Sequence, residues 1–377
     1  MTAVPEGTDD WGGWVEGQLG ALRAEGRWRE NRTFDARGPA GRRDGRALTS
    51  FASNDYLGLS AHPSVIAAAQ EAVARWGTGA TASRLVVGSR PPHDDLEAAL
   101  ADWKGTEAAL VFPTGYQANV GVLATLAGPD TTVLSDELNH ASIIDGVRLG
   151  RGRKVVYRHG DVDHLASCLD AVGGRALVVT DAVFSMDGDV APVAELAALC
   201  ADRGALLVLD EAHSVLGPAV PEIPRLDLVR VGTLSKTLGA LGGWVAGSRA
   251  IVDLLVNRAR SYIFTTALSP ADTAAGLAAL RVLRSRDGAA LVDQLRAHVE
   301  RLRPGHPSPI IPIVLGDEEA ALKAADALLE RGILVPAIRP PTVAPGSSRL
   351  RVALSAAHTD VMVDDLRGAL RDLGLLP

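Results

Sequence analysis

Lysine is scarce in this chain, and one lysine has an unusual setting. Lys236 is the only charged residue in the stretch 231–248, which otherwise holds small and apolar residues. Burial disfavours a charged amine, so such a lysine loses its proton more easily and can form an imine with a carbonyl compound. Arginine keeps its proton and cannot replace it there. The pattern predicts a Schiff-base lysine, with a surface lysine in a loop as the alternative.

The other three lysines have ordinary explanations. Lys104 precedes Gly105 at the end of a predicted helix, where a positive charge is favourable. Lys154 lies in the basic turn 151–154, and Lys323 follows Glu319 by four residues, as in surface helix pairs. These ordinary settings make the three lysines weaker candidates for imine chemistry than Lys236.

An acidic and a basic residue follow a buried strand at 205–210. Asp210 ends the apolar run and His213 comes three residues later. Ligands of open α/β sheets bind outside the carboxyl ends of the strands, so both side chains are candidates for a site. The alternatives are a helix N-cap for Asp210 and a structural role for His213.

Asp210 and Lys236 together indicate pyridoxal phosphate. This cofactor needs a lysine for its imine and a carboxylate that keeps the ring nitrogen protonated, so that the ring can accept electrons from a carbanion. A donor such as His213 can hold its phenolic oxygen. Thr114, Gly115 and Tyr116 lie between the strand at 108–112 and a helix that begins near Gln117, and helix N-termini bind phosphate.

A further histidine, His140, follows another strand end in the segment 139–142. Its ring could stack on the cofactor, and a structural role is the alternative. No cysteine-rich metal site is predicted, because the two cysteines, Cys168 and Cys200, each lie in an apolar helical pattern. Two cysteines also do not indicate a disulfide framework, and their scarcity fits a reducing cytoplasm.

The elements that must position these residues follow a regular order. Short apolar runs alternate with helical patterns from about residue 94 to 247, which predicts an α/β fold with a mostly parallel, doubly wound sheet. Two helices over 270–303 and a compact α+β unit follow. We divide the chain into an N-terminal segment (1–50), a large cofactor-binding domain (51–260), and interdomain helices with a smaller C-terminal α+β domain (261–377).

Composition excludes several functions. The chain has 377 residues, 47% of them hydrophobic, and a net charge of −7, so it can bury a large core and lacks the basic footprint of a nucleic-acid-binding protein. No apolar run reaches the ~18 residues of a membrane span. No signal peptide is visible at the N-terminus. We expect a cytoplasmic protein with neither nucleic-acid nor membrane partners.

Eight segments then occur in an order that is typical of one family. Together they resemble the α-oxoamine synthases, pyridoxal-phosphate enzymes of fold type I, over roughly residues 50–360. The region 338–358 is most similar to the biotin-pathway branch of this family. The segments are SNDYLGLS (53–60), GTGATASRLVVGS (77–89), HDDLE (93–97), PTGYQAN (113–119), DELNHAS (136–142), VFSMDGDVAP (183–192), DEAHS (210–214) and TLSK (233–236).

The resemblance implies a role for each matching residue. Lys236 would hold the cofactor as an imine, Asp210 would pair with the ring nitrogen, and His140 would stack on the ring. The remaining roles are contacts to the phenolic oxygen (His213 and Ser185), to the phosphate (Gly115, Tyr116 and Thr233), to the phosphate of a neighbouring subunit (Thr265), to the amino-acid carboxylate (Asn54 and Arg349) and to the acyl group (Thr342, in the loop 340–343).

The resemblance also implies the reaction and the partners. The enzyme would be a homodimer that condenses L-alanine with pimeloyl-CoA or pimeloyl-acyl carrier protein and releases carbon dioxide. The alternatives are a sister enzyme that uses glycine with acetyl-CoA or serine with a long acyl-CoA, and a catalytically inactive regulatory subunit. Ser235 departs from the pattern, because many relatives have glycine before the lysine. The N-terminal arginines Arg23, Arg27 and Arg29 are either part of a solvated face or contacts for the acyl carboxylate or carrier.

Overall fold

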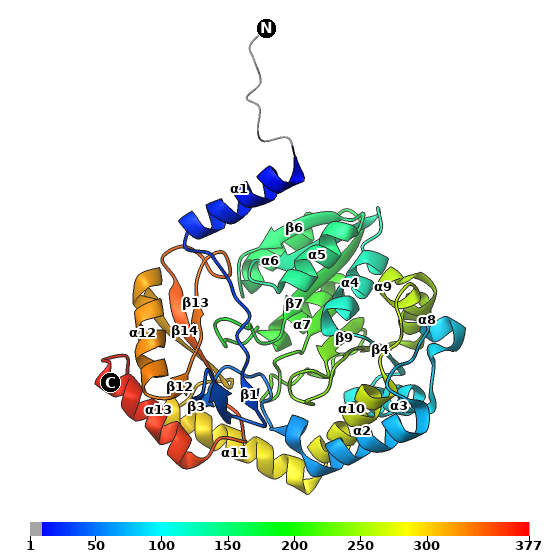
Figure 1. Ribbon diagram of the computed structural model, residues 1–377. Helices are drawn as coiled ribbons and strands as arrows, with labels where there is room; N and C mark the ends of the chain where they lie inside the picture. Colours follow the sequence, from blue (N-terminus) through cyan, green and yellow to red (C-terminus); the bar gives the residue numbers. More distant parts are fainter. Residues whose placement is uncertain (1–9, 377) are drawn as a thin grey trace.

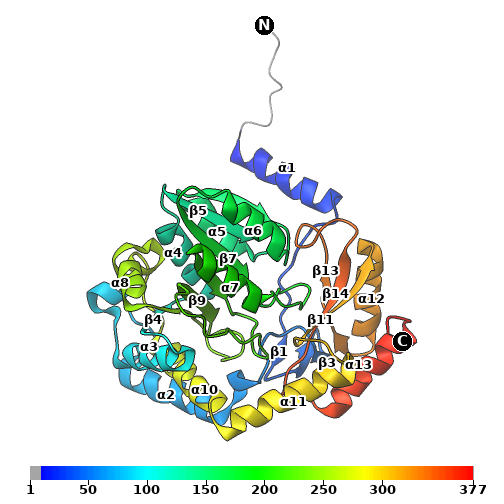
Figure 2. The ribbon, with the colours of Figure 1, turned by 180° about the vertical axis from the view of Figure 1, so that it is seen from behind.

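The computed structural model describes residues 10–376 and divides them between a large and a small domain (Figures 1 and 2). Within these residues, the large domain is built on a seven-stranded sheet of order β4-β10-β9-β8-β7-β5-β6. Strands β5 to β9 pair in parallel, and β10 runs antiparallel to both β4 and β9. The predicted mostly parallel sheet is confirmed. The strands are β4 (Ala108–Phe112), β5 (Thr131–Asp136), β6 (Arg153–Tyr157), β7 (Arg175–Asp181), β8 (Leu206–Asp210), β9 (Leu228–Thr233) and β10 (Gly243–Gly247).

Helices cover both faces of this sheet, because alternate residues of its strands point to opposite sides and nearly all are apolar. Val133 and Val208 belong to the core on one face, and Leu134 and Leu207 to the core on the other. Helices α4 and α8 pack on the first face, and α6 and α7 on the second. The helices of this domain are α2 (Pro63–Trp76), α3 (Pro91–Lys104), α4 (Gly115–Leu126), α5 (Ala141–Leu149), α6 (Val162–Asp170), α7 (Val193–Arg203), α8 (Arg249–Arg258), α9 (Arg260–Ile263) and α10 (Pro270–Leu283).

The small domain holds the predicted C-terminal α+β unit. In the described chain its sheet has the order β11-β14-β13, and helix α11 joins it to the large domain (Figure 1). Strand β14 is buried at every residue. The elements are α11 (Arg286–Leu302), β11 (Ile310–Gly316), α12 (Glu318–Glu330), β12 (Ile333–Leu334), β13 (Ala337–Ile338), β14 (Ser348–Ala353) and α13 (Asp360–Asp372).

The N-terminal segment contributes to the small domain as well. Strands β1 (Asp35–Ala36), β2 (Ala40–Arg43) and β3 (Arg46–Ser50) form an antiparallel series, and β3 pairs in parallel with β12. The predicted helix near 11–26 is present as α1 (Trp11–Ala24), capped by Asp10, and none of its residues is buried. Figure 1 shows α1 lying apart from both domains. No helix among residues 10–376 is long and apolar enough to cross a membrane.

One loop of the large domain is packed tightly against the small domain. Gly188 has φ +67°, and its carbonyl accepts a hydrogen bond of 2.6 Å from Ser308 Oγ. A Cβ on Gly188 would lie 1.9 Å from the carbonyl oxygen of Ile310 at the start of β11. The two domains therefore meet at backbone-to-backbone distance here, and a side chain does not fit.

We expect Gly188→Ala to lower the free energy of unfolding more than Gly204→Ala does. Gly204 has a similar φ of +61° but no atom within 4 Å of its Cβ position, so it provides the matched control. Gly204→Ala should cost about 1–2 kcal/mol from the left-handed backbone alone. Thermal or urea unfolding of both variants measures the difference, and equal losses would contradict a steric role for Gly188.

Candidate active site

The chemically active side chains gather at the carboxyl ends of the central strands. Asp136, Asp181 and Asp210 are the last residues of β5, β7 and β8, and Thr233 is the last residue of β9. Parallel strands bring these ends to one edge of the sheet, where ligands of open α/β folds bind. Lys236 follows β9 by three residues and reaches the same edge.

Lys236 lies in a half-buried position against His213. Its Nζ is 2.9 Å from His213 Nε2. Burial lowers the pKa of the Lys236 amine, and the carboxylates of Asp210 and Asp181 partly offset this effect. A lowered pKa raises the fraction of free amine, which is the form that attacks a carbonyl group. The structure thus gives Lys236 the environment that the sequence predicted.

Asp210 is buried and has a fixed orientation. Its Oδ1 accepts a hydrogen bond of 2.9 Å from the backbone N–H of Ala212, and its Oδ2 accepts one of 2.6 Å from Asn119 Nδ2. Asn119 Nδ2 also donates to Ser142 Oγ at 2.9 Å. Sequence reasoning missed Asn119 as a functional residue, although it lies in the segment 113–119 that carried the family resemblance.

Asp181 is a second carboxyl beside Asp210. The two residues are paired in the register of β7 and β8, and both are buried. Burial, and then the neighbouring Asp210, raises the pKa of Asp181 well above its usual value. Its Oδ2 accepts a hydrogen bond of 2.8 Å from the backbone N–H of His140. Asp181 therefore holds the backbone of His140, the N-cap of α5, and the sequence did not reveal this role.

A continuous series of contacts runs from Lys236 to the small domain. His213 Nδ1 is 2.6 Å from the hydroxyl of Tyr56, and that hydroxyl is 3.2 Å from Asn54 Oδ1. Asn54 Oδ1 in turn accepts a hydrogen bond of 3.0 Å from Arg351 Nη2. Burial, followed by the charges of Lys236 and Arg351, holds the pKa of His213 well below its usual value, so its imidazole is neutral at pH 7.

The structure pairs Asn54 with Arg351 and not with the predicted Arg349. Arg349 forms an ion pair with Asp187 and donates to the carbonyl of Ser347 at 2.9 Å. Both arginines lie on β14 and are buried, but Arg351 is the one whose charge acts on Lys236 and His213. Arg349 and Arg351 are two residues apart on β14 and share one face of the strand, and the structure places Arg351, not Arg349, against Asn54.

Gly115 and Thr233 form a narrow cradle at the start of α4. A Cβ on Gly115 would lie 3.1 Å from Thr233 Cβ, so a larger residue would fill the space. Thr233 Oγ1 is 2.7 Å from Ser235 Oγ, which means that the unusual Ser235 adds a hydroxyl to this cradle. Tyr116 contributes the next backbone N–H of the helix, while its own hydroxyl donates to Asp145.

The remaining predicted residues surround this centre less closely. His140 is the N-cap of α5, its Nδ1 is 2.7 Å from Ser142 Oγ, and partial desolvation lowers the pKa of its ring. Ser185 accepts a hydrogen bond of 2.5 Å from Arg351 Nε through its carbonyl. Thr265 Oγ1 accepts one of 3.4 Å from Gln117 Nε2 of the same chain. Thr342 is exposed in its loop, and its backbone N–H donates a hydrogen bond of 3.0 Å to the carbonyl of Arg339.

These residues fit pyridoxal phosphate. The set supplies an amine of lowered pKa, a buried carboxylate held by two donors, and a glycine cradle with hydroxyls at a helix N-terminus. Asn119 Oδ1 and Ser214 Oγ are buried here without a partner among the described residues. The donor types match the three parts of the cofactor: its aldehyde, its ring nitrogen and its phosphate.

Lys104 is the last residue of α3, as predicted, and its side chain is only 9% exposed. Its Nζ is 2.5 Å from Glu211 Oε2 and lies over the ring of Trp103 at 3.5 Å from the centroid. Glu211 also binds Arg230 Nε at 2.6 Å. Helix α3 ends against the sheet, so its last residue meets the strand ends instead of water. A buried charge needs such partners, and they assign Lys104 to a structural ion cluster.

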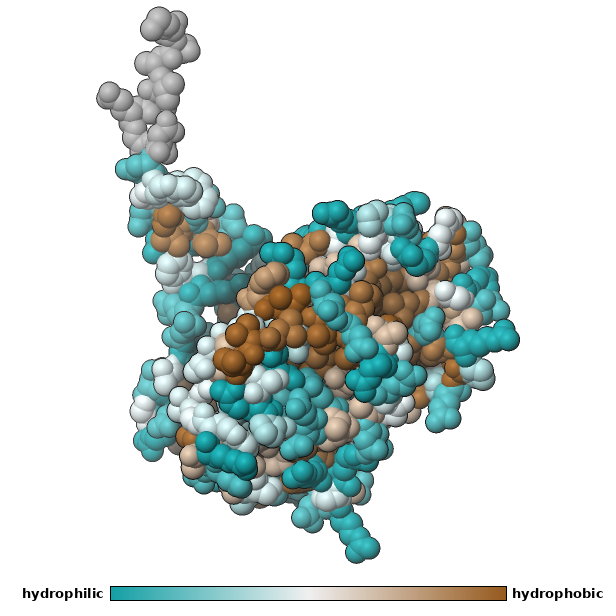
Figure 3. Space-filling model, turned by 90° about the vertical axis from the view of Figure 1, so that its right-hand side faces the viewer, coloured by the Kyte–Doolittle hydropathy of each residue, from teal (hydrophilic) through white to brown (hydrophobic). Residues whose placement is uncertain are grey.

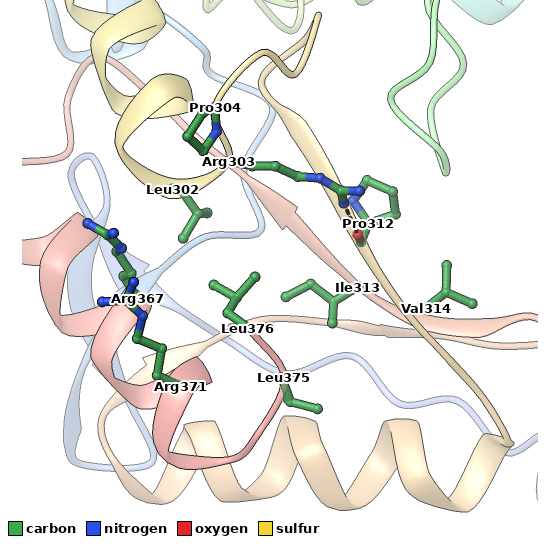
Figure 4. A pocket seen from close by; sticks show the side chains of 10 residues that line it. All are labelled: Leu302, Arg303, Pro304, Pro312, Ile313, Val314, Arg367, Arg371, Leu375 and Leu376. Carbon is green, nitrogen blue, oxygen red and sulfur yellow. Dashed lines mark hydrogen bonds between the residues drawn. The ribbon is translucent and has the colours of Figure 1, made fainter.

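A separate cavity of about 490 Å³ lies on the small domain (Figure 4). Figure 4 shows Arg367 and Arg371 on α13 at one side of it, and Arg303, which donates to the carbonyl of Pro312 at 3.0 Å, at the other. The lining residues include none of those at the strand ends. The cavity is therefore distinct from the candidate active site.

Comparisons with known proteins agree with this geometry. The sequence profile of aminotransferase class I and II matches residues 46–370. Curated 8-amino-7-oxononanoate synthases of Anaeromyxobacter dehalogenans and Alkalilimnicola ehrlichii are 52% and 50% identical, over 95% and 93% of this chain and 94% and 95% of theirs. The chain therefore belongs to the class I and II aminotransferase family and, within it, to the 8-amino-7-oxononanoate synthases.

Solved structures show the same fold. The serine palmitoyltransferase of Sphingomonas wittichii superimposes with a TM-score of 0.86 at 33% identity, covering 96% of this chain and 98% of that one. The 8-amino-7-oxononanoate synthase of Francisella tularensis gives a TM-score of 0.71 at 27% identity, covering 86% and 96%. The predicted fold type I architecture and the resemblance to the α-oxoamine synthases are confirmed.

We expect borohydride reduction of the cofactor-loaded protein to attach a pyridoxyl group to Lys236. Its pKa is lowered and its Nζ faces the cofactor-binding edge of the sheet. Lys104 is an internal control, because its amine is also buried but is held by Glu211. Peptide mapping by mass spectrometry locates the label, and a label on Lys104, Lys154 or Lys323 would contradict the assignment.

Proposed function

We propose that this protein is a pyridoxal-phosphate-dependent acyltransferase of biotin biosynthesis. It condenses L-alanine with a pimeloyl thioester of coenzyme A or acyl carrier protein and forms 8-amino-7-oxononanoate, carbon dioxide and the free thiol. One observation carries the proposal: Lys236, His213, Asp210 and Asn119 converge at the strand ends of a chain that is 52% identical to an 8-amino-7-oxononanoate synthase.

Each part of the site has a task toward the cofactor. When bound, pyridoxal phosphate supplies an aldehyde for the amine of alanine and a ring that accepts electrons from its α-carbon. Asp210, oriented by Asn119, would keep a proton on the ring nitrogen. The phosphate would be held by Gly115, Tyr116 and Thr233, the phenolic oxygen by His213 and Ser185, and the ring by His140.

Lys236 moves the proton that starts the reaction. With alanine bound at the site, the free amine of Lys236 would accept the α-proton, and its lowered pKa suits a base that must be uncharged near neutral pH. His213 is neutral and 2.9 Å from Nζ, so it can orient this amine without repelling it. The α-carbon would then bond to the thioester carbonyl carbon as the thiolate leaves, and the thiolate would take up the proton held by Lys236. The carboxylate of alanine would depart as carbon dioxide, and a proton from solvent would replace it on the α-carbon.

Asn54 and Arg351 form the site proposed for the carboxylate of alanine. Arg351 is buried, and its guanidinium donates to Asn54 from Nη2 and to Ser185 from Nε. A guanidinium can bind a carboxylate with two parallel hydrogen bonds, which fixes the direction of the α-carbon. Arg349, the residue expected from the sequence, has its charge matched by Asp187 instead.

The acyl chain is assigned to the loop at residues 340–343 and to the N-terminal segment. Arg339 Nη1 donates to the carbonyl of Gly26 at 3.2 Å, so the two segments are in contact. Thr342 is exposed beside them. The far carboxylate of a pimeloyl group needs basic or polar neighbours, and Arg27 and Arg29 lie in the adjoining stretch. This placement supports the loop as the acyl site.

The protein is proposed to act as a cytoplasmic homodimer. Leu85, Val86 and Val87 in the short helix η2 (Arg84–Gly88) and Phe264 after α9 are exposed apolar residues, and Val86 is 72% exposed. Figure 3 shows a broad apolar area on the face of the molecule that carries α8 and α9 in Figure 1. A second copy of the chain would cover such a surface, and Thr265 lies next to Phe264 where it could meet the partner's phosphate site.

A sister synthase that uses serine and a long acyl thioester is the second candidate. Its support is the fold, since solved serine palmitoyltransferases give TM-scores up to 0.90 at 30% identity. Fold is shared across chemistries, whereas about 50% identity over nearly the whole chain is a likeness of sequence as well as of fold. The sequence likeness therefore favours alanine and pimeloyl thioester.

We expect alanine with pimeloyl thioester to give the highest kcat/KM in a panel that also contains glycine with acetyl-CoA and serine with palmitoyl-CoA. Slow use of glycine is compatible with the proposal, because one methyl group in a pocket contributes only about 1–3 kcal/mol. Mass spectrometry identifies the product. Preference for serine with palmitoyl-CoA, or for glycine with acetyl-CoA, would replace the proposal with the sister function.

We expect Arg351→Ala to weaken alanine binding by about 2–5 kcal/mol, the usual loss when a buried charged partner is removed. Arg349→Ala is the matched control on the same strand face and should bind alanine almost as the unmodified protein does. Titration of the cofactor absorbance with alanine measures both. If Arg349→Ala lost alanine binding and Arg351→Ala kept it, the carboxylate would belong to Arg349.

A further inference from the structure

We propose that His159 is a positioning residue that joins two active-site segments by bonding to a carboxylate on each. The first segment is the turn 136–140, which leads from β5 to His140. The second is the loop 183–190, which carries Ser185 and Asp187. The inference rests on the proposed function, because it concerns the geometry of the same alanine site.

His159 is held between two carboxylates. Its Nδ1 is 2.9 Å from Asp136 Oδ1, and its Nε2 is 2.7 Å from Asp189 Oδ2. A neutral imidazole has one N–H and could donate to one of them, whereas the imidazolium donates to both. The ring also meets Phe184 edge to face, with 4.3 Å between the centroids. The geometry therefore selects a charged ring fixed in position and orientation.

Asp136 connects this ring to the turn that presents His140. Its Oδ1 also accepts a hydrogen bond of 2.9 Å from the N–H of Leu138, and its Oδ2 accepts one of 3.0 Å from the N–H of Gly160. The side chain of Asp136 is 2% exposed, so its charge depends on these partners. The turn and the segment after β6 thus close around one buried carboxylate.

Asp189 connects the ring to the loop that meets the arginines of β14. The loop is closed by hydrogen bonds from Phe184 N–H to Asp189 O and from Gly188 N–H to Phe184 O. Within it, the carbonyl of Ser185 accepts from Arg351, and Asp187 pairs with Arg349. His159 therefore supports, through the loop, the arginine that is proposed to bind the carboxylate of alanine.

The two carboxylates that contact His159 both raise the pKa of its ring. Hydrogen bonds to Asp136 and then to Asp189 raise the pKa of His159 to about 10. On its own segment, Arg158 and Asp161 pair with each other at 2.7 Å. In the segment after α11, burial lowers the pKa of His306, and the charge of Asp189 partly offsets this effect. Tyr157, at the end of β6, has its pKa raised by burial and then by Asp136.

The sign of the pH effect follows from the raised pKa. The folded protein holds the proton of His159 more tightly than the unfolded chain does, whose histidines titrate near about 6.5. The bridge therefore contributes its full stability below about pH 6.5 and loses it progressively as pH rises through about 10. Over the neutral range the two segments stay joined.

The test uses the cofactor-loaded protein with His159→Gln, His159→Arg and Asp189→Asn. Glutamine removes the charge, and arginine keeps a cation with several donors. Asp189→Asn breaks the loop side while Asp136 keeps its histidine, so it serves if His159→Gln does not fold. His164→Gln is the control, because His164 lies in the same region and, among the described residues, its imidazole bonds only to the N–H of Arg158.

We expect His159→Gln and Asp189→Asn to raise the half-saturating concentration of alanine about 10- to 100-fold, the effect of shifting a positioned group by about 1 Å. His159→Arg should restore most of the alanine affinity, and His164→Gln should leave the half-saturating concentration of alanine unchanged. Nuclear magnetic resonance of labelled histidine should show the His159 ring charged up to about pH 9, and limited proteolysis should cut the loop 183–190 faster in His159→Gln.

Two results would overturn the proposal: a His159 ring that titrates near the ordinary value of about 6.5, or His159→Gln and Asp189→Asn proteins with unchanged alanine saturation and proteolysis. Equal loss in His159→Arg and His159→Gln would also count against a charged bridge. Failure of the proposed function is separate. If the unmodified protein made no product from alanine and pimeloyl thioester, the resonance and proteolysis results would still decide the role of His159.

Discussion

The burial of Asp210 at the end of β8 is the constraint on which the rest of the site depends. A carboxylate removed from water needs hydrogen bonds and a positive partner, and the fold supplies both. The backbone of Ala212 and the amide of Asn119 hold its two oxygens, and the amine of Lys236 lies close enough for the two charges to interact. The same interaction offsets part of the pKa decrease that burial imposes on Lys236.

The site is divided between two domains, and the loop 183–190 brings them together. Its glycine meets the backbone of β11 with no space for a side chain, its carbonyl at Ser185 holds Arg351, and its carboxylate at Asp187 holds Arg349. Cofactor chemistry is located on the large domain, and the proposed carboxylate site is located on β14 of the small domain. Domain placement is therefore part of the catalytic geometry, and contacts outside the cofactor site, such as those of His159, bear on it.

A shared fold does not identify the substrate in this family. The solved serine palmitoyltransferases superimpose closely on this chain although their sequences are about a third identical, because the sheet and its helices serve one cofactor in both. The curated 8-amino-7-oxononanoate synthases share about half of their residues with it. Substrate choice rests on side chains in pockets that the common fold leaves free to vary.

The sheet, the cofactor and a candidate imine-forming lysine could all be predicted from the sequence. Alternating apolar runs require a sheet covered on both faces, and a lone charge in an apolar stretch marks Lys236. The pairing of Asn54 with Arg351 and not with Arg349 is seen only in the folded chain. Residues two apart on a strand point to the same side, so periodicity cannot separate them, and the choice depends on which one lies opposite Asn54. Likewise, the burial of Lys104 and the bridge made by His159 depend on partners 107, 23 and 30 residues away, which meet them only when the strand ends converge.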